Sequence, residues 1–417
     1  MARRRRRRRK TLLTWFKSLS TWKKVVLIAG AIIMVLFCIL ICYVASVFNK
    51  MDTEVIEEEE IVINDLDDTV GVGYTNILLL GGDSREGNVT GSLNTDTIIV
   101  ASLNNATKEV KLVSVYRDTL LEISNGNIQK CNSAYSIGGA KQAINMINRN
   151  LDLDIQKFVT VDFTAVVDLI DMIGGIDVEI TEPERLAINQ YIWETALVAG
   201  QKITYVSDNG LVHLNGQQAT TYARIRKGVG DDFARTERQR IVIGKIVDKA
   251  LQSNLATINK IINKIFPRIS TNFTLAEVLS YAKSFTKYSI GETTGFPFEK
   301  GSDVIPGKGD CIYPVTLKGN VSMLHEFLYG TVDYQPSVQA SNISNNIAYV
   351  VGNRPAESIG NSMSEEPETP IEPEVPTEQE PPTEQEPPTE QEPPAEQEPP
   401  AEPETPVESE PLEEATM

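Results

Sequence analysis

The stretch from Val25 to Val47 is mainly apolar and contains no charged residue. Roughly 20 apolar residues are enough to cross the hydrocarbon core of a bilayer, so we expect the chain to span a membrane once, at residues 25–48. The stretch is too long for the apolar region of a signal peptide, and no small-residue cleavage pattern follows it. The rest of the chain therefore has to fold on one or the other side of a membrane.

The charges that flank this span predict its direction. An unbroken basic run, Arg3–Arg9, lies before it, whereas the acidic residues Asp52, Glu54 and Glu57–Glu60 follow it. Basic segments next to a membrane span remain on its cytoplasmic side. Residues 1–24 are therefore predicted to form a cytoplasmic arm, and everything after the span is predicted to lie outside the cytoplasm. Basic runs also bind nucleic acids, but this arm is too short for a DNA-binding module, so we expect no nucleic-acid partner.

The C-terminal end repeats a short acidic motif. Residues 377–400 read TEQEPP three times and AEQEPP once, and the part from Ser364 onward holds 19 Glu and no Lys or Arg. Like charges and proline prevent such a segment from building a core, so residues 355–417 are predicted to be a disordered tail that acts as a spacer or binds a partner. Without these 19 charges the net charge of −18 becomes about +1, so the acidity belongs to the tail.

Residues 49–71 form an acidic juxtamembrane linker, and residues 72–354 are long enough for one sizeable domain. Short apolar runs predict strands, and amphipathic patterns predict helices between and after them. The predicted strands are 76–80, 97–103, 110–116 and 158–161, and the predicted helices are 140–150, 163–173, 216–224, 236–251 and 275–287. Interleaved strands and helices favour an α/β domain.

Cysteine and histidine narrow the possible chemistry. Cys131 and Cys311 are the two cysteines of the exported part, and the sequence leaves open whether they pair. The chain has only two histidines, His213 and His325. This argues against a histidine metal centre and against a serine–histidine triad.

Two acidic residues lie at the ends of predicted strands. Asp83 follows two glycines after the strand 76–80, and Asp96 comes directly before the strand 97–103. If these strands are neighbours, both carboxylates reach the sheet edge at which ligands approach α/β domains. Two carboxylates without histidine suit Mg²⁺ (or Mn²⁺) shared with substrate phosphates. The alternative for Asp83 is a simple turn residue.

Basic residues gather farther along the chain. Arg117 follows the strand 110–116, and residues 224–240 hold the richest group: Arg224, Arg226, Lys227, Asp231, Asp232, Arg235, Arg238, Gln239 and Arg240. Guanidinium groups bind phosphate oxygens in a bidentate manner, and the dipole of the helix 236–251 adds to the positive field. The pattern predicts an oxyanion clamp, with a solvated helix face as the alternative.

Seven segments of residues 75–251 resemble, in this order, the catalytic domain of the LytR–CpsA–Psr family: NILLLGGDSR, NTDTIIVASLN, VSVYRDT, KCNSAYSIGG, FVTVDFTAVVDLIDMIGGIDVEI, HLNGQQATTYARIR and DDFARTERQR. The predicted short cytoplasmic arm, single span and exported domain also match the architecture of that family. The resemblance implies a central mixed β-sheet flanked by helices. It also implies a membrane-anchored phosphotransferase of a Gram-positive bacterium, which moves a glycopolymer from a polyprenyl pyrophosphate carrier onto peptidoglycan outside the cell membrane.

The resemblance also assigns roles to residues. Asp83 and Asp96 match the residues associated with Mg²⁺. The substrate-binding residues it implies are Arg85, Arg117, Arg224, Arg226, Arg235, Arg238 and Gln239, and the catalytic ones are Arg117, Arg224, Arg226, Asp232 and Arg235. Two positions depart from the family pattern, namely Asn94, where members carry arginine, and Tyr116, where they carry proline.

An isoprenoid carrier requires an apolar site. Phe163, Val167 and Ile170 on one predicted helix, with Trp193 farther on, are the candidates for lining a lipid tunnel, although apolar residues at helical spacing also form ordinary core.

The proton acceptor is expected to be Asp232 or Asp231. Two other functions remain open: a pyrophosphatase that acts on the same lipid, and a non-catalytic scaffold that binds exported glycopolymer.

Overall fold

The computed structural model describes residues 45–46, 48–82, 95–226 and 229–352. The predicted cytoplasmic arm, nearly all of the predicted span, Asp83, Arg85 and Asn94, and the predicted tail lie outside these ranges. Within them, no helix combines the length and apolarity that a membrane crossing requires.

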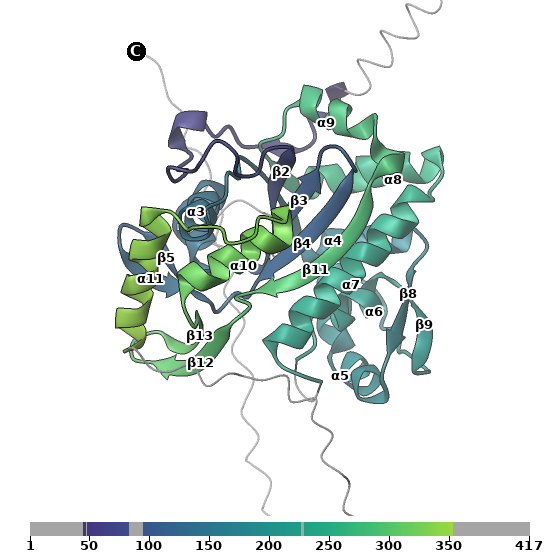
Figure 1. Ribbon diagram of the computed structural model, residues 1–417. Coiled ribbons are helices and arrows are strands. Elements are labelled where there is room, and N and C mark those ends of the chain that lie inside the picture. The colour runs from purple at the N-terminus through teal and green to yellow at the C-terminus, as the bar shows by residue number, and fades with distance from the viewer. Residues whose placement is uncertain (1–44, 47, 83–94, 227–228, 353–417) are drawn as a thin grey trace, which may run out of the picture. The chain divides into compact units, whose positions relative to one another are not determined.

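A seven-stranded mixed sheet organises the described residues (Figure 1). Its strand order is β1-β10-β7-β2-β3-β4-β11. The strands are β1 (Asp52–Thr53), β2 (Tyr74–Gly82), β3 (Thr95–Asn104), β4 (Glu109–Val115), β7 (Lys157–Asp162), β10 (Ile269–Thr271) and β11 (Ser289–Phe296). The pairs β2–β7 and β4–β11 are parallel, whereas β3 is antiparallel to both β2 and β4. The mixed sheet that the family resemblance implied is therefore present.

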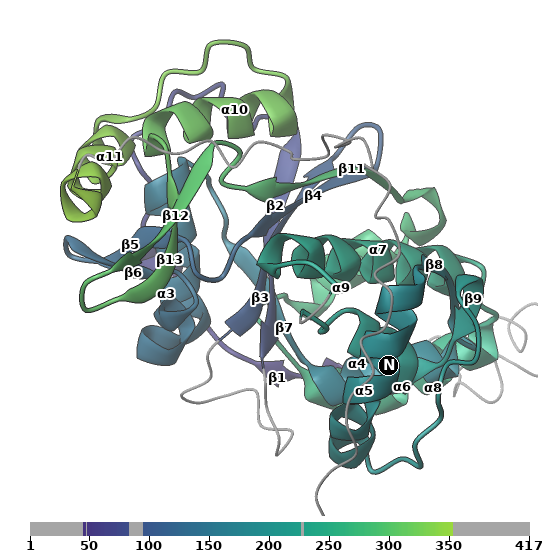
Figure 2. The same cartoon turned by 90° about the horizontal axis from the view of Figure 1, so that it is seen from below.

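Helices cover both faces of this sheet, as Figures 1 and 2 show. One side carries α3 (Ser133–Leu151), α10 (Leu317–Tyr329) and α11 (Val338–Val351). The other carries α4 (Phe163–Met172), α5 (Glu182–Ala199), α6 (Gly216–Tyr222), α7 (Asp232–Leu251) and α8 (Leu255–Ile265). The predicted α/β architecture with flanking helices is confirmed.

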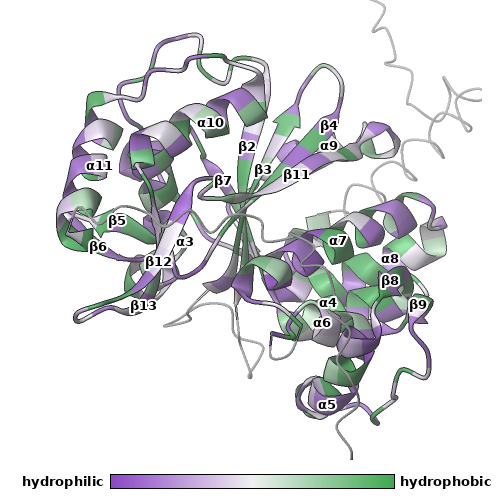
Figure 3. Ribbon diagram, turned by 60° about the horizontal axis from the view of Figure 1, so that its bottom comes forward, coloured by the Kyte–Doolittle hydropathy of each residue, from purple (hydrophilic) through white to green (hydrophobic). Residues whose placement is uncertain are grey.

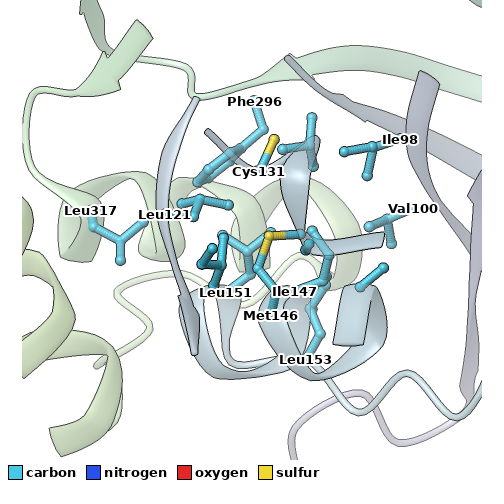
Figure 4. Packing of buried hydrophobic residues seen from close by; sticks show 14 of the residues in the cluster. Ile98, Val100, Leu121, Cys131, Met146, Ile147, Leu151, Leu153, Phe296 and Leu317 are labelled. Atoms are coloured by element: carbon cyan, nitrogen blue, oxygen red, sulfur yellow. The ribbon is translucent and has the colours of Figure 1, made fainter. Parts of the chain in front are cut away.

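The alternation of side chains along the central strands explains this layering. On β2, Leu78 and Leu80 point into the core beneath α3, while Leu79 packs against a smaller cluster on the opposite face. Strand β3 alternates in the same way with Val100 and Ile99. Strand side chains alternate between faces, and an apolar side chain contributes about 1.5–3 kcal/mol when fully buried. Both faces of the sheet must therefore be covered, and Figure 4 shows the larger of these cores.

A second core lies among the helices that follow β7. It joins α4, α5, α6 and α7 with the hairpin of β8 (Ile176–Ile180) and β9 (Gly210–Leu214). Capping boxes begin two of its helices, Thr181 with Glu184 for α5 and Asn215 with Gln218 for α6. Figure 3 shows hydrophobic colouring on the central strands and on the helices around this core. The core fixes α4–α7 as one unit beside the sheet.

The remaining elements complete the part of the chain that the structure describes. They are the hairpins β5 (Leu120–Ser124)–β6 (Asn127–Lys130) and β12 (Lys300–Ile305)–β13 (Gly309–Pro314), the helix α9 (Leu275–Ala282), and three short 3-10 turns, η1 (Glu58–Glu60), η2 (Phe266–Arg268) and η3 (Phe285–Lys287). Cys131 and Cys311 are both buried and unpaired thiols.

A buried carboxylate connects the segment 49–71 with residues near the C-terminal helices. Asp152, which has no exposed surface, accepts hydrogen bonds from Asn64 Nδ2 at 2.6 Å, from Ser337 N at 2.7 Å and from Tyr334 OH at 3.3 Å. Asp152 also ends α3 in the left-handed backbone region, with φ of 53°. One charge thus holds together segments from three distant parts of the chain.

Replacing Asp152 by Ala is expected to lower the free energy of unfolding by about 2–4 kcal/mol, because several buried donors lose a charged acceptor. Denaturant titration of the protein measures the change. Asp333 is the matched control, since it is exposed and also has a positive φ, of 55°. Asp333→Ala should change the stability by less than about 0.5 kcal/mol, and an equal loss for both variants would contradict this account.

Candidate functional site

One end of the sheet gathers the charged residues. Strand β2 ends at Gly82, which pairs with Thr95 at the start of β3 on one side and with Asp162 at the end of β7 on the other. Strand β4 ends at the same edge and leads directly into Arg117. The antiparallel β3 therefore presents Asp96 beside Arg117. The predicted meeting of Asp83 with Asp96 stays a prediction, because Asp83, like Arg85, lies outside the described residues.

Arg117 is the centre of a charged network. Its Nη1 donates to Asp96 Oδ1 at 2.7 Å and its Nε donates to Asp118 Oδ2 at 3.1 Å. Lys130 Nζ lies 2.9 Å from Asp118 Oδ1. Burial alone would lower the pKa of Arg117, but the hydrogen bond and charge of Asp96, together with other carboxylates, raise it. Arg117 therefore stays charged and fixed in direction.

The first turn of α7 supplies the opposite part of the network. Asp231 caps the helix by accepting from the backbone of Phe233 and Ala234. Asp232 Oδ1 lies 3.0 Å from Arg226 Nε and 3.1 Å from Arg235 Nη2. Burial raises the pKa of Asp232, while the charges of Arg226 and Arg117 oppose that rise, so the two parts of the network are within electrostatic reach of each other. The structure thus brings together Arg117, Arg226, Asp232 and Arg235, as the sequence predicted.

These ion pairs leave polar atoms unsatisfied. Arg235 is 3 % exposed, yet its Nε and Nη2 have no hydrogen-bond partner, and neither does Oδ1 of Asp232 or Oε1 of Gln239. Arg235 and Asp232 are therefore close enough to attract each other but are not aligned as a hydrogen bond. Buried polar groups are normally satisfied, and unsatisfied guanidinium donors favour an anionic ligand.

Arg224 lies at the boundary with the second core. Its guanidinium carbon is 4.8 Å from the centre of the Phe163 ring, a distance typical of a cation–π contact. A cavity of about 280 Å³ opens beside it, lined by Tyr191, Glu194, Thr195, Thr221, Arg224, Ile225 and Arg226. The arginines thus adjoin a pocket between α5 and α6.

The four predicted lipid-binding residues differ in burial. Val167 and Ile170 are buried, with Ile170 in the second core, and Phe163 packs against Arg224. Trp193, in contrast, is 52 % exposed on α5. The helical periodicity of α5 places Trp193 away from its buried neighbours Ile188 and Ile192. The structure therefore buries Val167 and Ile170 but leaves Trp193 largely exposed, and the lipid-binding role of all four residues stays a prediction.

Arg238 is engaged differently from the other arginines. Its Nε donates to Glu184 Oε1 at 2.9 Å, its Nη1 donates to the Ile225 carbonyl at 2.8 Å, and its Nη2 donates to the Val229 carbonyl. Sequence reasoning gave Arg238 a substrate-binding role, but these contacts occupy each nitrogen of its guanidinium group. We therefore assign Arg238 to holding the loop between α6 and α7, which carries Arg226.

The sheet edge offers oxygen ligands of the kind that Mg²⁺ prefers. Asp96 presents a carboxylate that is partly exposed, and the buried Oδ2 of Asp162 has no hydrogen-bond partner. Within the described ranges no group of three His, Cys, Asp or Glu side chains is close enough to hold a metal by itself. The donor chemistry thus fits a hard cation that takes further ligands from elsewhere.

Sequence reasoning gave no role to Asp118, Lys130 or Glu184. Asp118 follows Arg117 directly and could have been noticed from that position. Lys130 and Glu184 come from other elements, β6 and α5, and reach the network only through the tertiary fold. No local sequence signal marks them.

Comparisons with known proteins identify one protein family and relatives with similar names. The sequence model of the LytR_cpsA_psr family matches residues 39–308. TagV of Bacillus subtilis (strain 168), named a polyisoprenyl-teichoic acid–peptidoglycan teichoic acid transferase, is 30% identical over 58% of this chain and 60% of its own length. TagU of Enterococcus faecalis, which carries the same activity in its name, is 28% identical over 67% of this chain and 90% of its own length.

Solved structures share the fold. TagT bound to LI-WTA has a TM-score of 0.51 at 20% identity, covering 66% of this chain and 98% of that structure. Protein gbs0355 from Streptococcus agalactiae has a TM-score of 0.53 at 25% identity, covering 64% of this chain and 92% of that structure. The mixed sheet with flanking helices is thus an arrangement found in known proteins.

The different surroundings of two neighbouring arginines lead to a prediction. Arg235→Gln should weaken the binding of inorganic diphosphate by about tenfold or more, because a charge-assisted hydrogen bond is worth about 1.5–3 kcal/mol. Arg238→Gln should mainly lower the melting temperature, because it breaks contacts within the protein. Calorimetric titration and thermal unfolding of both variants measure the two effects. Diphosphate binding that is equal to wild type in Arg235→Gln would show that these guanidinium donors do not serve an anion.

Proposed function

Because this chain belongs to the LytR–CpsA–Psr family, we propose that it is a phosphotransferase that moves a glycopolymer from a polyprenyl diphosphate carrier to peptidoglycan. The relatives that carry such an activity in their names cover most of the described domain, although the match spans only 60% of the length of TagV. The observation that carries the proposal is the group of arginines at one sheet end, of which Arg235 keeps buried donors without a partner.

The clamp we propose consists of Arg117, Arg224, Arg226 and Arg235. Their guanidinium groups would hold the diphosphate and neutralise the charge that develops on its oxygens. In phosphoryl transfer the protein acts mainly through positioning and electrostatics. The arginines suit this role because carboxylates and the Phe163 ring fix their directions, so little reorganisation is needed when the substrate binds.

The proposed reaction is a displacement at phosphorus. The oxygen of a peptidoglycan hydroxyl attacks the phosphorus atom that bears the polymer. The bond from that phosphorus to the bridging oxygen breaks, and polyprenyl monophosphate leaves. The hydroxyl proton passes to a base, and the products are a polymer–peptidoglycan phosphodiester and the carrier monophosphate.

Asp232 suits the role of base better than Asp231. Asp231 accepts two backbone hydrogen bonds as the cap of α7, which commits one of its oxygens. Asp232 is half-buried among the arginines. Burial raises its pKa, the charges of Arg226 and Arg117 lower it, and Asp118 raises it again, with a net upward shift. A carboxylate of raised pKa is a stronger base.

Mg²⁺ is part of the proposal as well. Asp96 and Asp83 would hold it, Asp83 being outside the described residues. When bound, the ion would add positive charge next to the diphosphate oxygens. Arg117 would keep Asp96 oriented for that ion through their 2.7 Å hydrogen bond.

The proposal also includes the location of the protein in the cell. Residues 25–48 would anchor the protein in the cytoplasmic membrane, and the domain would face the cell wall. The carrier's isoprenoid would enter between the helices of the second core, because Arg224 and the adjacent cavity connect the clamp with this apolar region. The polymer itself is not specified by these residues.

The test is transfer by the purified full-length protein in detergent. Arg117→Ala and Arg224→Ala should each lower the rate at least about 100-fold, the usual effect of removing an electrostatic contact to the transition state. Arg185→Ala is the control, since Arg185 pairs with Glu182 in the first turns of α5, outside the clamp. Products are compared with and without peptidoglycan. Undiminished transfer by both clamp variants would contradict the clamp, and free phosphorylated polymer in both samples would indicate hydrolysis instead.

The pKa of Asp232 gives a pH dependence. A base must be deprotonated, so the rate should fall as the pH drops through the raised pKa, which lies above the ordinary value of about 3.9. Arg226→Gln removes a charge that lowers this pKa, so the acid limb of kcat/KM should move to higher pH. Arg185→Gln should leave the limb in place. A limb that stays unchanged or moves to lower pH in Arg226→Gln would exclude Asp232 as the base.

A further inference from the structure

Two aromatic rings and two cations form a cluster beside the clamp that the proposed reaction does not use. The cluster consists of Tyr116, Phe233, Arg240 and Lys300. Tyr116 directly precedes Arg117, and Phe233 directly follows Asp232, so both rings adjoin the network of charges. Lys300 comes from the start of β12 and Arg240 from α7.

The rings and the lysine are in direct contact. The ring centres of Tyr116 and Phe233 are 4.5 Å apart with an angle of 74° between their planes, an edge-to-face arrangement. Lys300 Nζ lies 4.6 Å from the centre of the Phe233 ring and 5.4 Å from that of Tyr116. Tyr116 is buried, whereas Phe233 and Lys300 are partly exposed. The outer part of the cluster is thus open to a ligand.

The two cations of this cluster form no ion pair with the residues that the structure describes, although Asp231 acts electrostatically on Lys300 and Glu237 on Arg240. Among the residues that the structure describes, Lys300 has no carboxylate within ion-pair distance, and Nε and Nη1 of Arg240 are buried without a hydrogen-bond partner. The carboxylate of Asp231, which acts electrostatically on Lys300, already caps α7. Lys300 is thus held over the two rings by cation–π contacts, while its ammonium group is partly exposed and free to donate to a ligand.

The sheet order separates this cluster from the carrier side of the clamp. Phe163, which packs on Arg224, follows the end of β7, while Lys300 comes shortly after the end of β11. Strands β2, β3 and β4 lie between β7 and β11. Asp96 lies on β3, and Arg117 follows the end of β4 by two residues, so this part of the charged network lies between the two flanks.

This order matches the geometry of the proposed reaction. In a displacement at phosphorus the attacking and the leaving oxygens are roughly in line. If the carrier leaves toward Arg224 and the second core, the attacking hydroxyl must arrive from the flank of β11 and β12. On that flank lie the two rings and Lys300.

We propose that Lys300, Phe233 and Tyr116 form a subsite for the acceptor, an amino sugar of a peptidoglycan strand. The C–H surface of the sugar would pack on Phe233, and Lys300 would donate to its carbonyl or carboxylate oxygens. Tyr116 supports Phe233 from behind. This inference rests on the proposed function, because that function makes peptidoglycan the acceptor.

The test uses Lys300→Met and Phe233→Leu, which keep apolar bulk but remove the charge or the ring. Acceptor affinity is measured in two ways, by the KM for uncrosslinked glycan strands at saturating donor, and by direct binding of those strands without donor. Lys300→Met should weaken both by about tenfold, the effect of one charge-assisted contact. The KM for the lipid-linked donor should stay within about twofold, and Lys300→Arg should restore acceptor affinity.

Lys111 provides the matched control. Its Nζ lies 5.1 Å from the centre of the Phe327 ring, so it makes the same kind of cation–π contact elsewhere in the domain. Lys111→Met should leave both acceptor measurements unchanged, and the melting temperature of each variant reveals any general damage to the fold.

The outcomes separate the subsite from the proposed function. Unchanged strand binding in Lys300→Met, equal losses for donor and acceptor, or a wild type that binds no strand would each overturn the subsite. A wild type that binds strands but never forms the phosphodiester would refute the proposed transfer, while the binding comparison would still decide whether Lys300 and Phe233 hold the glycan.

Discussion

Like charges crowded at one end of the sheet are the constraint on which the site depends. Arg117 and Arg226 repel each other, and burial together with the charge of Arg117 lowers the pKa of Arg226. The carboxylates of Asp96, Asp118 and Asp232 offset the repulsion between the arginines. The ion pairs of Asp232, however, are not aligned as hydrogen bonds. Charge is compensated while donors remain available, which is what a site for a diphosphate requires.

The second core and the Arg238–Glu184 pair give this network its rigidity. Glu184 caps α5 and binds Arg238 of α7, while Arg238 binds two carbonyls of the loop that carries Arg226. A buried ion pair of this kind is weak evidence for stability but is well suited to fixing one arrangement. The arginines of the clamp can thus be held near one another before any ligand arrives.

The order of the strands gives the site two different flanks. On the side of β7, the helices α4 to α6 that follow this strand in the chain hold the second core and a cavity at Arg224. On the side of β4 lies β11, followed in the chain by β12 with Lys300. An enzyme that joins a lipid-borne donor to a polar glycan needs such a difference. The mixed sheet supplies it by placing the charged residues between the two.

Many of the helices and strands, and several residues of the site, were predictable from the sequence because they depend on local patterns. Short apolar runs predict β2 and β3, helical spacing predicts α4 and α7, and Arg117 is predicted directly after a strand. The edge strand β11 escaped prediction because its sequence, SIGETTGF, buries little apolar surface away from its last two residues. Only the tertiary structure decided which partners and which exposure each of several similar side chains has. Arg235 and Arg238 are one helical turn apart, yet Arg235 keeps free donors and Arg238 is tied to Glu184, which lies 54 residues away. Trp193 likewise faces outward although its neighbours are buried. The sequence determines which groups are present and in which element, but the partner of a charge depends on segments that only folding brings together.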